Sequence, residues 1–123
     1  MVNRGIPYYG THIDLLYPSE DGLLPDIGAF INLIREATGK EPDATFGKPS
    51  VNMIEPILLE HDLTPDDAVI VGDRLYTDIQ LGKDAGATTV LVLSGETRRD
   101  DIAPDGIKPD IILDSVKDLA DLL

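Results

Sequence analysis

Short apolar runs alternate with helical patterns along this chain, and that alternation constrains its fold more than any other feature. Residues 68–71 and 88–93 are nearly continuous apolar runs, as expected of parallel strands that are buried on both faces. Shorter strands are predicted at residues 6–10, 44–47 and 110–113, and helices at residues 25–38, after Ser50, at residues 75–85 and after Ser115. An alternation repeated about five times predicts the α/β class, with a mostly parallel sheet and helices on both faces.

The helix expected after Ser50 contains a local conflict. Pro56 falls in its interior, where proline removes a backbone hydrogen bond. The helix is therefore expected to start late or to bend. Its predicted inner face carries Ile54, Ile57 and Leu58.

Size and charge narrow the class of protein. The 123 residues suffice for one domain with a single core, so residues 1–123 are assigned to one domain. A formal net charge of −13 argues against nucleic acid and anionic membranes as partners, because both repel an acidic surface. No apolar run approaches the roughly 18 residues of a membrane span, and the absence of cysteine excludes disulfides and thiolate metal sites. A cytoplasmic protein is the expectation.

One predicted strand end carries two acidic residues. The strand at residues 68–71 is followed by Gly72-Asp73, and Asp78 lies inside the next helix. Ligands of parallel sheets bind beyond the carboxyl ends of the strands. Two carboxylates at this spacing can converge on Mg²⁺, which takes one or two carboxylates and keeps several waters. The spacing is equally compatible with a simpler role, in which Asp73 only caps the following helix.

A second predicted strand end carries a cation. Gly47-Lys48-Pro49 follows the strand at residues 44–47, which places the Lys48 ammonium near the same edge of the sheet, where it suits a phosphate oxygen. This is not a Walker loop, because the preceding glycines are absent and proline follows the lysine. A solvent-facing loop lysine is the alternative. A third strand end, residues 93–97, offers a hydroxyl and a capping pattern that an ordinary loop explains.

Together the strand ends resemble the third and fourth motifs of the haloacid dehalogenase (HAD) superfamily. The residues concerned are Gly47-Lys48-Pro49 and Val69-Ile70-Val71-Gly72-Asp73 with Asp78. The resemblance covers essentially the whole chain and is nearest to the branch of NagD-like and 4-nitrophenylphosphatase-like sugar-phosphate phosphatases. In that branch an Ala-Thr-Asn-Pro-Asp segment precedes the lysine, and Gly10-Thr11-His12-Ile13-Asp14 looks like a variant of it.

The resemblance implies a Rossmann-like, HAD-like core domain that hydrolyses small phosphate monoesters through an aspartyl-phosphate, with Mg²⁺ as cofactor. Lys48 would be a catalytic residue that pairs with the nucleophile and with the substrate phosphate. Asp73 would be a catalytic residue and a Mg²⁺ ligand. Asp78 would support the metal.

The nucleophile of this superfamily belongs to an Asp-x-Asp motif, and the chain contains no Asp-x-Asp. Asp14 is the nearest imitation, and a supporting loop role is favoured for it over that of a displaced nucleophile. The first strands of the family fold and its cap domain are also expected to be absent. The chain is therefore interpreted as the carboxyl-terminal part of a HAD-like core, inactive by itself.

Two interpretations of the chain stay open. The chain is either a fragment of a larger enzyme or a complete small protein with a non-catalytic regulatory or interaction role. A receiver-like domain is disfavoured, because its lysine follows the acidic residues whereas Lys48 precedes Asp73. Without its family neighbours the strand at residues 68–71 has an unpaired edge, at a cost on the order of several kcal/mol. A homo-oligomer or a missing amino-terminal half is expected to cover that edge.

Overall fold

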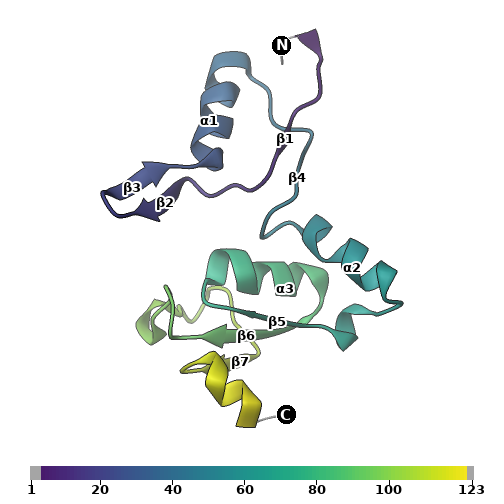
Figure 1. Ribbon diagram of the computed structural model, residues 1–123, viewed down its shortest axis with the longest axis vertical. Helices are drawn as coiled ribbons and strands as arrows, with labels where there is room; N and C mark the ends of the chain where they lie inside the picture. The colour runs from purple at the N-terminus through teal and green to yellow at the C-terminus, as the bar shows by residue number, and fades with distance from the viewer. Residues whose placement is uncertain (1–3, 122–123) are drawn as a thin grey trace. The chain divides into compact units, whose positions relative to one another are not determined.

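The computed structural model describes residues 4–121 and has a mixed α/β architecture with parallel strands and helices (Figure 1). Its backbone contacts divide the chain into two compact units, Met1–Met53 and Ile54–Leu123. Each unit has strands and helices of its own. The assignment of residues 1–123 to one part of a single core domain stays a prediction.

The first unit contains two strand pairs and one long helix. β1 (Tyr9–Gly10) pairs in parallel with β4 (Ala44–Thr45). β2 (Leu16–Ser19) and β3 (Gly22–Pro25) form an antiparallel hairpin. α1 (Ile27–Thr38) follows this hairpin directly, as Figure 1 shows. The predicted strands at residues 6–10 and 44–47 are therefore present but shorter than expected.

The hairpin is not apparent from the sequence. Pro18 lies within β2, and proline is disfavoured in strands because it cannot donate to the ladder. Gly22 opens β3 with φ 119°, a conformation that favours glycine. The residues of β2 and β3 remain mostly exposed. The hairpin therefore has no buried face that would require apolar and polar residues to alternate, and this alternation is the pattern that predicts a strand from sequence.

α1 begins and ends at recognisable capping residues. The Asp26 carboxylate accepts a hydrogen bond from the Ile27 N–H at 2.8 Å, which stabilises the amino end. Gly39 ends the helix with φ 70°, the left-handed conformation that only glycine adopts without steric cost. Ile31 is buried on the inner face of the helix.

The helix after Ser50 starts late, as Pro56 requires. A 3₁₀ turn, Val51–Met53, comes first, and α2 (Glu55–Glu60) follows. Pro56 lies in the first turn of α2, where the proline lacks only an N–H that would have had no intrahelical partner.

A small apolar core forms in the second unit. Ile54 and Leu58 are each 8% exposed and pack together with Leu81. Ile57 is 53% exposed, so its assignment to the inner face is wrong. In a helix this short, the buried stripe follows the i, i+4 pair of Ile54 and Leu58, and Ile57 lies off that stripe.

The second unit is built on three parallel strands. β5 (Val69–Gly72), β6 (Thr88–Val92) and β7 (Ile111–Leu113) pair in the order β5-β6-β7. A π-helical turn, Leu75–Ile79, leads into α3 (Gln80–Ala85), which lies along β5 and β6 in Figure 1. Gly86 ends α3 with φ 77°, and the predicted positions of the three strands and this helix are confirmed.

β6 and β5 differ in burial. Val90 and Leu91 of the central strand have no exposed surface, as expected for a doubly covered strand. Val69 and Val71 of β5 are 54% and 38% exposed, so burial of this strand on both faces is a wrong prediction. The other face of β5 carries Ile70, which packs against the core beneath α3. β5 has a hydrogen-bonded strand on one edge only among the described residues.

The helix predicted after Ser115 is present as a 3₁₀ helix, Val116–Asp121. Ser115 and Asp118 have capping-box spacing, and the Ser115 N–H donates to the Asp118 carboxylate at 2.8 Å. Two further 3₁₀ turns, Pro65–Asp67 and Arg99–Asp101, lie in the loops. In residues 4–121 no helix is both long enough and apolar enough to cross a membrane.

Candidate functional site at the carboxyl end of β5

Asp78 is buried against the end of β5. Its side chain is packed so closely on the Cα of Gly72 that a Cβ at position 72 would overlap it. Only 5% of Asp78 is exposed, and its Oδ2 accepts the Arg74 N–H at 3.1 Å. The aspartate therefore closes the turn that connects β5 to the π-helical segment. Gly72 is required here for close approach.

Asp73 projects from the tip of β5 into a different set of contacts. Its Oδ2 accepts the Glu96 N–H at 2.8 Å, and its carbonyl oxygen accepts the Thr97 N–H at 3.1 Å. The residue that precedes the helical turn is Arg74, without a side-chain cap. The interpretation of Asp73 as a helix cap is therefore wrong. Its carboxylate is held by the loop that follows β6.

Asp73 and Asp78 both offer carboxylate oxygens, the kind of ligand that Mg²⁺ takes in proteins. Residues 4–121 contain no group of three or more His, Asp or Glu side chains that could hold a metal. A structural Zn²⁺ site needs four ligands from the protein, whereas Mg²⁺ takes one or two carboxylates and completes its shell with water and substrate oxygens. The hydroxyl of Thr77 is buried without a hydrogen-bond partner, which leaves one polar atom beside Asp78 unsatisfied.

A charged cluster adjoins Asp73, and the sequence did not indicate it. The Arg74 Nε lies 2.6 Å from one oxygen of the Glu96 carboxylate, and the Tyr76 hydroxyl donates to the other oxygen at 3.1 Å. Residues 93–97 were interpreted as an ordinary loop. The signal that could have found the cluster is Gly95, because its Cα lies against the Asp73 carboxylate where no Cβ would fit.

Lys48 lies in the first unit, so the three predicted site residues are not all in one described unit. It is an exposed residue of a turn in which the Ser50 N–H donates to the Gly47 carbonyl at 3.0 Å. The Cα of Gly47 packs against the Thr11 carbonyl and against His12. The lysine thus follows a glycine that the close approach of Thr11 and His12 requires.

Asp14 belongs to the loop that supports α1. Its carbonyl oxygen accepts the Gly28 N–H at 2.8 Å. Its carboxylate is 4.0 Å from Nδ1 of His12, and Nε2 of His12 is 3.5 Å from the capping carboxylate of Asp26. These contacts fit a structural role in the first unit, and the supporting loop role of Asp14 stays a prediction.

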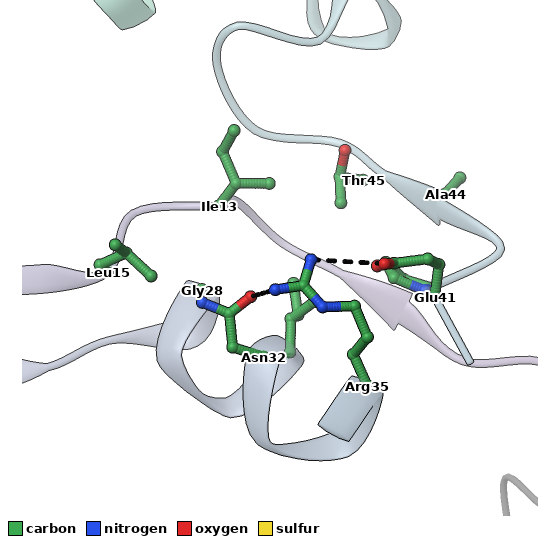
Figure 2. Close-up of a pocket in the computed structure, with 10 residues that line it drawn as sticks. Ile13, Leu15, Gly28, Asn32, Arg35, Glu41, Ala44 and Thr45 are labelled. Atoms are coloured by element: carbon green, nitrogen blue, oxygen red, sulfur yellow. Dashed lines mark hydrogen bonds and ion pairs between the residues drawn. The ribbon is translucent and has the colours of Figure 1, made fainter. Parts of the chain in front are cut away.

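A cavity of about 430 Å³ lies in the first unit, between α1, β4 and the segment that enters β2 (Figure 2). Arg35 crosses its polar side, where it donates to the Asn32 side chain at 2.6 Å and to the Glu41 carboxylate at 3.4 Å. Apolar side chains, among them Ile13 and Ile31, form the rest of the wall. None of the three predicted site residues lines this cavity.

The parallel α/β fold of the chain matches that of HAD-like hydrolases. Residues 45–119, more than half of the chain, match the family model described as HAD-hydrolase-like, and the chain belongs to this family. The resemblance inferred from the motifs is therefore confirmed.

Similar proteins carry phosphatase names. Dihydroxyacetone phosphatase of Corynebacterium glutamicum is 37% identical over 98% of this chain and 44% of its own length. The solved structure of the p-nitrophenyl phosphatase from Archaeoglobus fulgidus superposes with a TM-score of 0.90 at 40% identity, over 98% of this chain and 48% of the other. The 4-nitrophenylphosphatase from Thermotoga maritima gives a TM-score of 0.90 at 38% identity, over 98% and 46%. The chain thus spans less than half the length of these relatives.

Proposed function

We propose that this chain is the carboxyl-terminal part of a Mg²⁺-dependent phosphatase that hydrolyses small phosphate monoesters. The observation that carries the proposal is the strand-end arrangement of Asp73 and Asp78, each with one carboxylate oxygen held by a backbone N–H. Membership of the HAD-like hydrolase family and similarity to several named phosphatases support the same reaction class.

Three residues have assigned roles in this proposal. Asp73 and Asp78 would hold Mg²⁺, Asp73 as the direct ligand and Asp78 as its support. When bound, the metal neutralises charge on the phosphoryl oxygens. Lys48 supplies a compact positive charge for a substrate oxygen and for the nucleophile. Catalysis by such a set depends mainly on positioning and electrostatic stabilisation.

The aspartate nucleophile is assigned to a segment outside this sequence. No Asp-x-Asp is present here, and Asp14 has structural contacts that fit a supporting loop. In the complete enzyme the nucleophile would attack phosphorus and expel the alcohol, and water would then hydrolyse the aspartyl-phosphate. The 123-residue chain alone is expected to bind Mg²⁺ weakly and to show no turnover.

The test combines a binding and an activity measurement on the purified chain. Mg²⁺ is titrated while the backbone amide signals of residues 72–78 are followed by NMR. Shifts that saturate in the unaltered chain and disappear in Asp73→Asn are expected. Lys108→Met serves as a variant that changes charge without touching the site. Absence of any Mg²⁺-dependent shift would refute the metal assignment.

The activity arm uses 4-nitrophenyl phosphate with and without Mg²⁺. No turnover is expected for the 123-residue chain. Turnover that requires Mg²⁺ and is abolished by Asp14→Asn would refute the external nucleophile and identify Asp14 in its place. Turnover that survives Asp14→Asn would point to another carboxylate of this chain.

The exposed face and outer edge of β5 favour a second candidate, a non-catalytic interaction module. Val69 and Val71 present apolar surface on a strand whose outer edge pairs with no other strand among residues 4–121, a combination to which another chain can add a strand. On this proposal a second copy or an amino-terminal half covers the edge. A monomer by light scattering at high concentration would exclude the second copy.

A cytoplasmic location is part of the proposed function.

A further inference from the structure

We infer that Glu96 is a positioning residue for the proposed Mg²⁺ site, because it holds the metal ligand Asp73 with its backbone and the neighbouring Arg74 with its side chain. The inference rests on the proposed function and extends it to the loop after β6. Nothing in the motif pattern of the strand ends assigned a role to this loop.

The loop forms a cradle around the Asp73 carboxylate. The Glu96 N–H donates to Oδ2 at 2.8 Å, and the Cα of Gly95 lies against the same carboxylate. The Thr97 N–H donates to the Asp73 carbonyl at 3.1 Å, and Thr97 is itself 7% exposed. Among residues 4–121, Oδ1 of Asp73 has no hydrogen-bond partner. The loop therefore binds Oδ2 of Asp73 and leaves Oδ1 available to coordinate a cation.

The Glu96 side chain connects the cradle to the second carboxylate. One of its oxygens lies 2.6 Å from the Arg74 Nε, and the other accepts the Tyr76 hydroxyl at 3.1 Å. The Arg74 backbone N–H donates to Asp78 at 3.1 Å. A continuous set of contacts thus runs from Asp73 through Glu96 and Arg74 to Asp78.

The position of these contacts argues for an effect on the metal rather than on stability. Glu96 is 47% exposed and Arg74 28% exposed in their side chains, and an ion pair so accessible to water contributes little to stability. Partners that orient metal ligands act differently, because removing them costs about 10–100-fold in metal affinity even when the ligands remain. Orientation of Asp73 is what Glu96 controls here.

Two substitutions separate positioning from simple charge. Glu96→Gln removes the charge and keeps the length of the side chain. Glu96→Asp keeps the charge but is too short to reach Arg74 and Tyr76 from the same backbone. Positioning predicts that both variants lose Mg²⁺ affinity by about tenfold or more. A purely electrostatic effect predicts loss in Glu96→Gln alone. Glu60→Gln, an exposed carboxylate at the end of α2, is the matched control for net charge.

The experiment measures Mg²⁺ affinity by NMR titration and, without metal, the hydrogen-exchange rates of the residue 96 and Thr97 amides. Both Glu96 variants should weaken Mg²⁺ binding and accelerate exchange of these amides, while the amides of Val90 and Leu91 keep their protection and show that the sheet is folded. Glu60→Gln should leave both the Mg²⁺ affinity and the exchange of these amides unchanged.

Two results would overturn the inference, and they are distinguishable. Normal Mg²⁺ affinity or unchanged amide exchange in Glu96→Asp would refute positioning while the metal site stands. A failure of the unaltered chain to bind Mg²⁺ would refute the proposed function itself, and the inference with it.

Discussion

Replacement of Gly72 by alanine is the sharpest perturbation of the β5 strand end. An ideal Cβ at this position would lie 2.6 Å from Oδ2 of Asp78 and closer still to its Cβ and Cγ. Those distances are below normal van der Waals contact, so the aspartate must move. Asp78 is 5% exposed and has little room to do so.

The expected cost follows from three contributions. Overpacking of a tight site costs about 1–3 kcal/mol. Displacement of the Asp78 carboxylate also breaks the hydrogen bond from the Arg74 N–H, and a bond to a charged group contributes about 1.5–3 kcal/mol. Alanine offsets about 0.5–1 kcal/mol by reducing the entropy of the unfolded chain. Gly72→Ala should therefore lower the free energy of unfolding by about 3 kcal/mol.

Urea unfolding followed by circular dichroism measures this loss as a lower midpoint at unchanged slope. Gly106→Ala is the matched control, because its new Cβ would lie 3.4 Å from the nearest atom, in ordinary contact, and should change stability by less than about 1 kcal/mol. A loss of under about 1 kcal/mol in Gly72→Ala, comparable with an average substitution, would refute the packing argument.

Two further predictions concern the second unit. Leu58→Ala should lower the free energy of unfolding by about 2–4 kcal/mol, and Ile57→Ala by about 0.5 kcal/mol, in urea unfolding; equal losses would contradict the helix orientation described here. Hydrogen bonds from Lys83 at 2.5 Å and from Thr89 hold the pKa of the Asp110 carboxyl below its ordinary value. A depressed carboxyl pKa contributes stability that is present above the unfolded-state value of about 3.9 and is lost as pH falls through the lower folded value. The advantage over Asp110→Asn should be about 1 kcal/mol at neutral pH, since the side chain is 43% exposed and screened; an advantage unchanged in unfolding measurements at about pH 2 would contradict this assignment.

Features set by near neighbours in the chain were predictable. The glycines that end α1 and α3 adopt the left-handed conformation that their positions predict. Pro56 delays α2 by its missing N–H, which is a property of the residue itself. Apolar runs placed β5 and β6 to within one or two residues.

The candidate site was predicted only in part. The spacing of Asp73 and Asp78 indicated two carboxylates at a strand end, and the structure places both there. The alternative role of Asp73 as a helix cap was compatible with the same spacing. The hydrogen bond from the Glu96 N–H to the Asp73 carboxylate excludes the capping role. A local sequence pattern does not predict a hydrogen bond between residues so far apart in the chain.

The sequence by itself determined the α/β class, the order of the parallel strands and main helices, the glycines that end α1 and α3, and the motifs that indicate the family. Each of these depends on residue type and short-range spacing, whereas the β2–β3 hairpin did not appear in the sequence pattern. The tertiary structure decided which apolar residues are buried. Val69 and Val71 belong to an apolar run but remain exposed, since burial depends on what packs against a strand face and not on the strand's own composition. It also decided that Glu96 holds Asp73, because hydrogen bonds between distant segments exist only after β5 and β6 have paired.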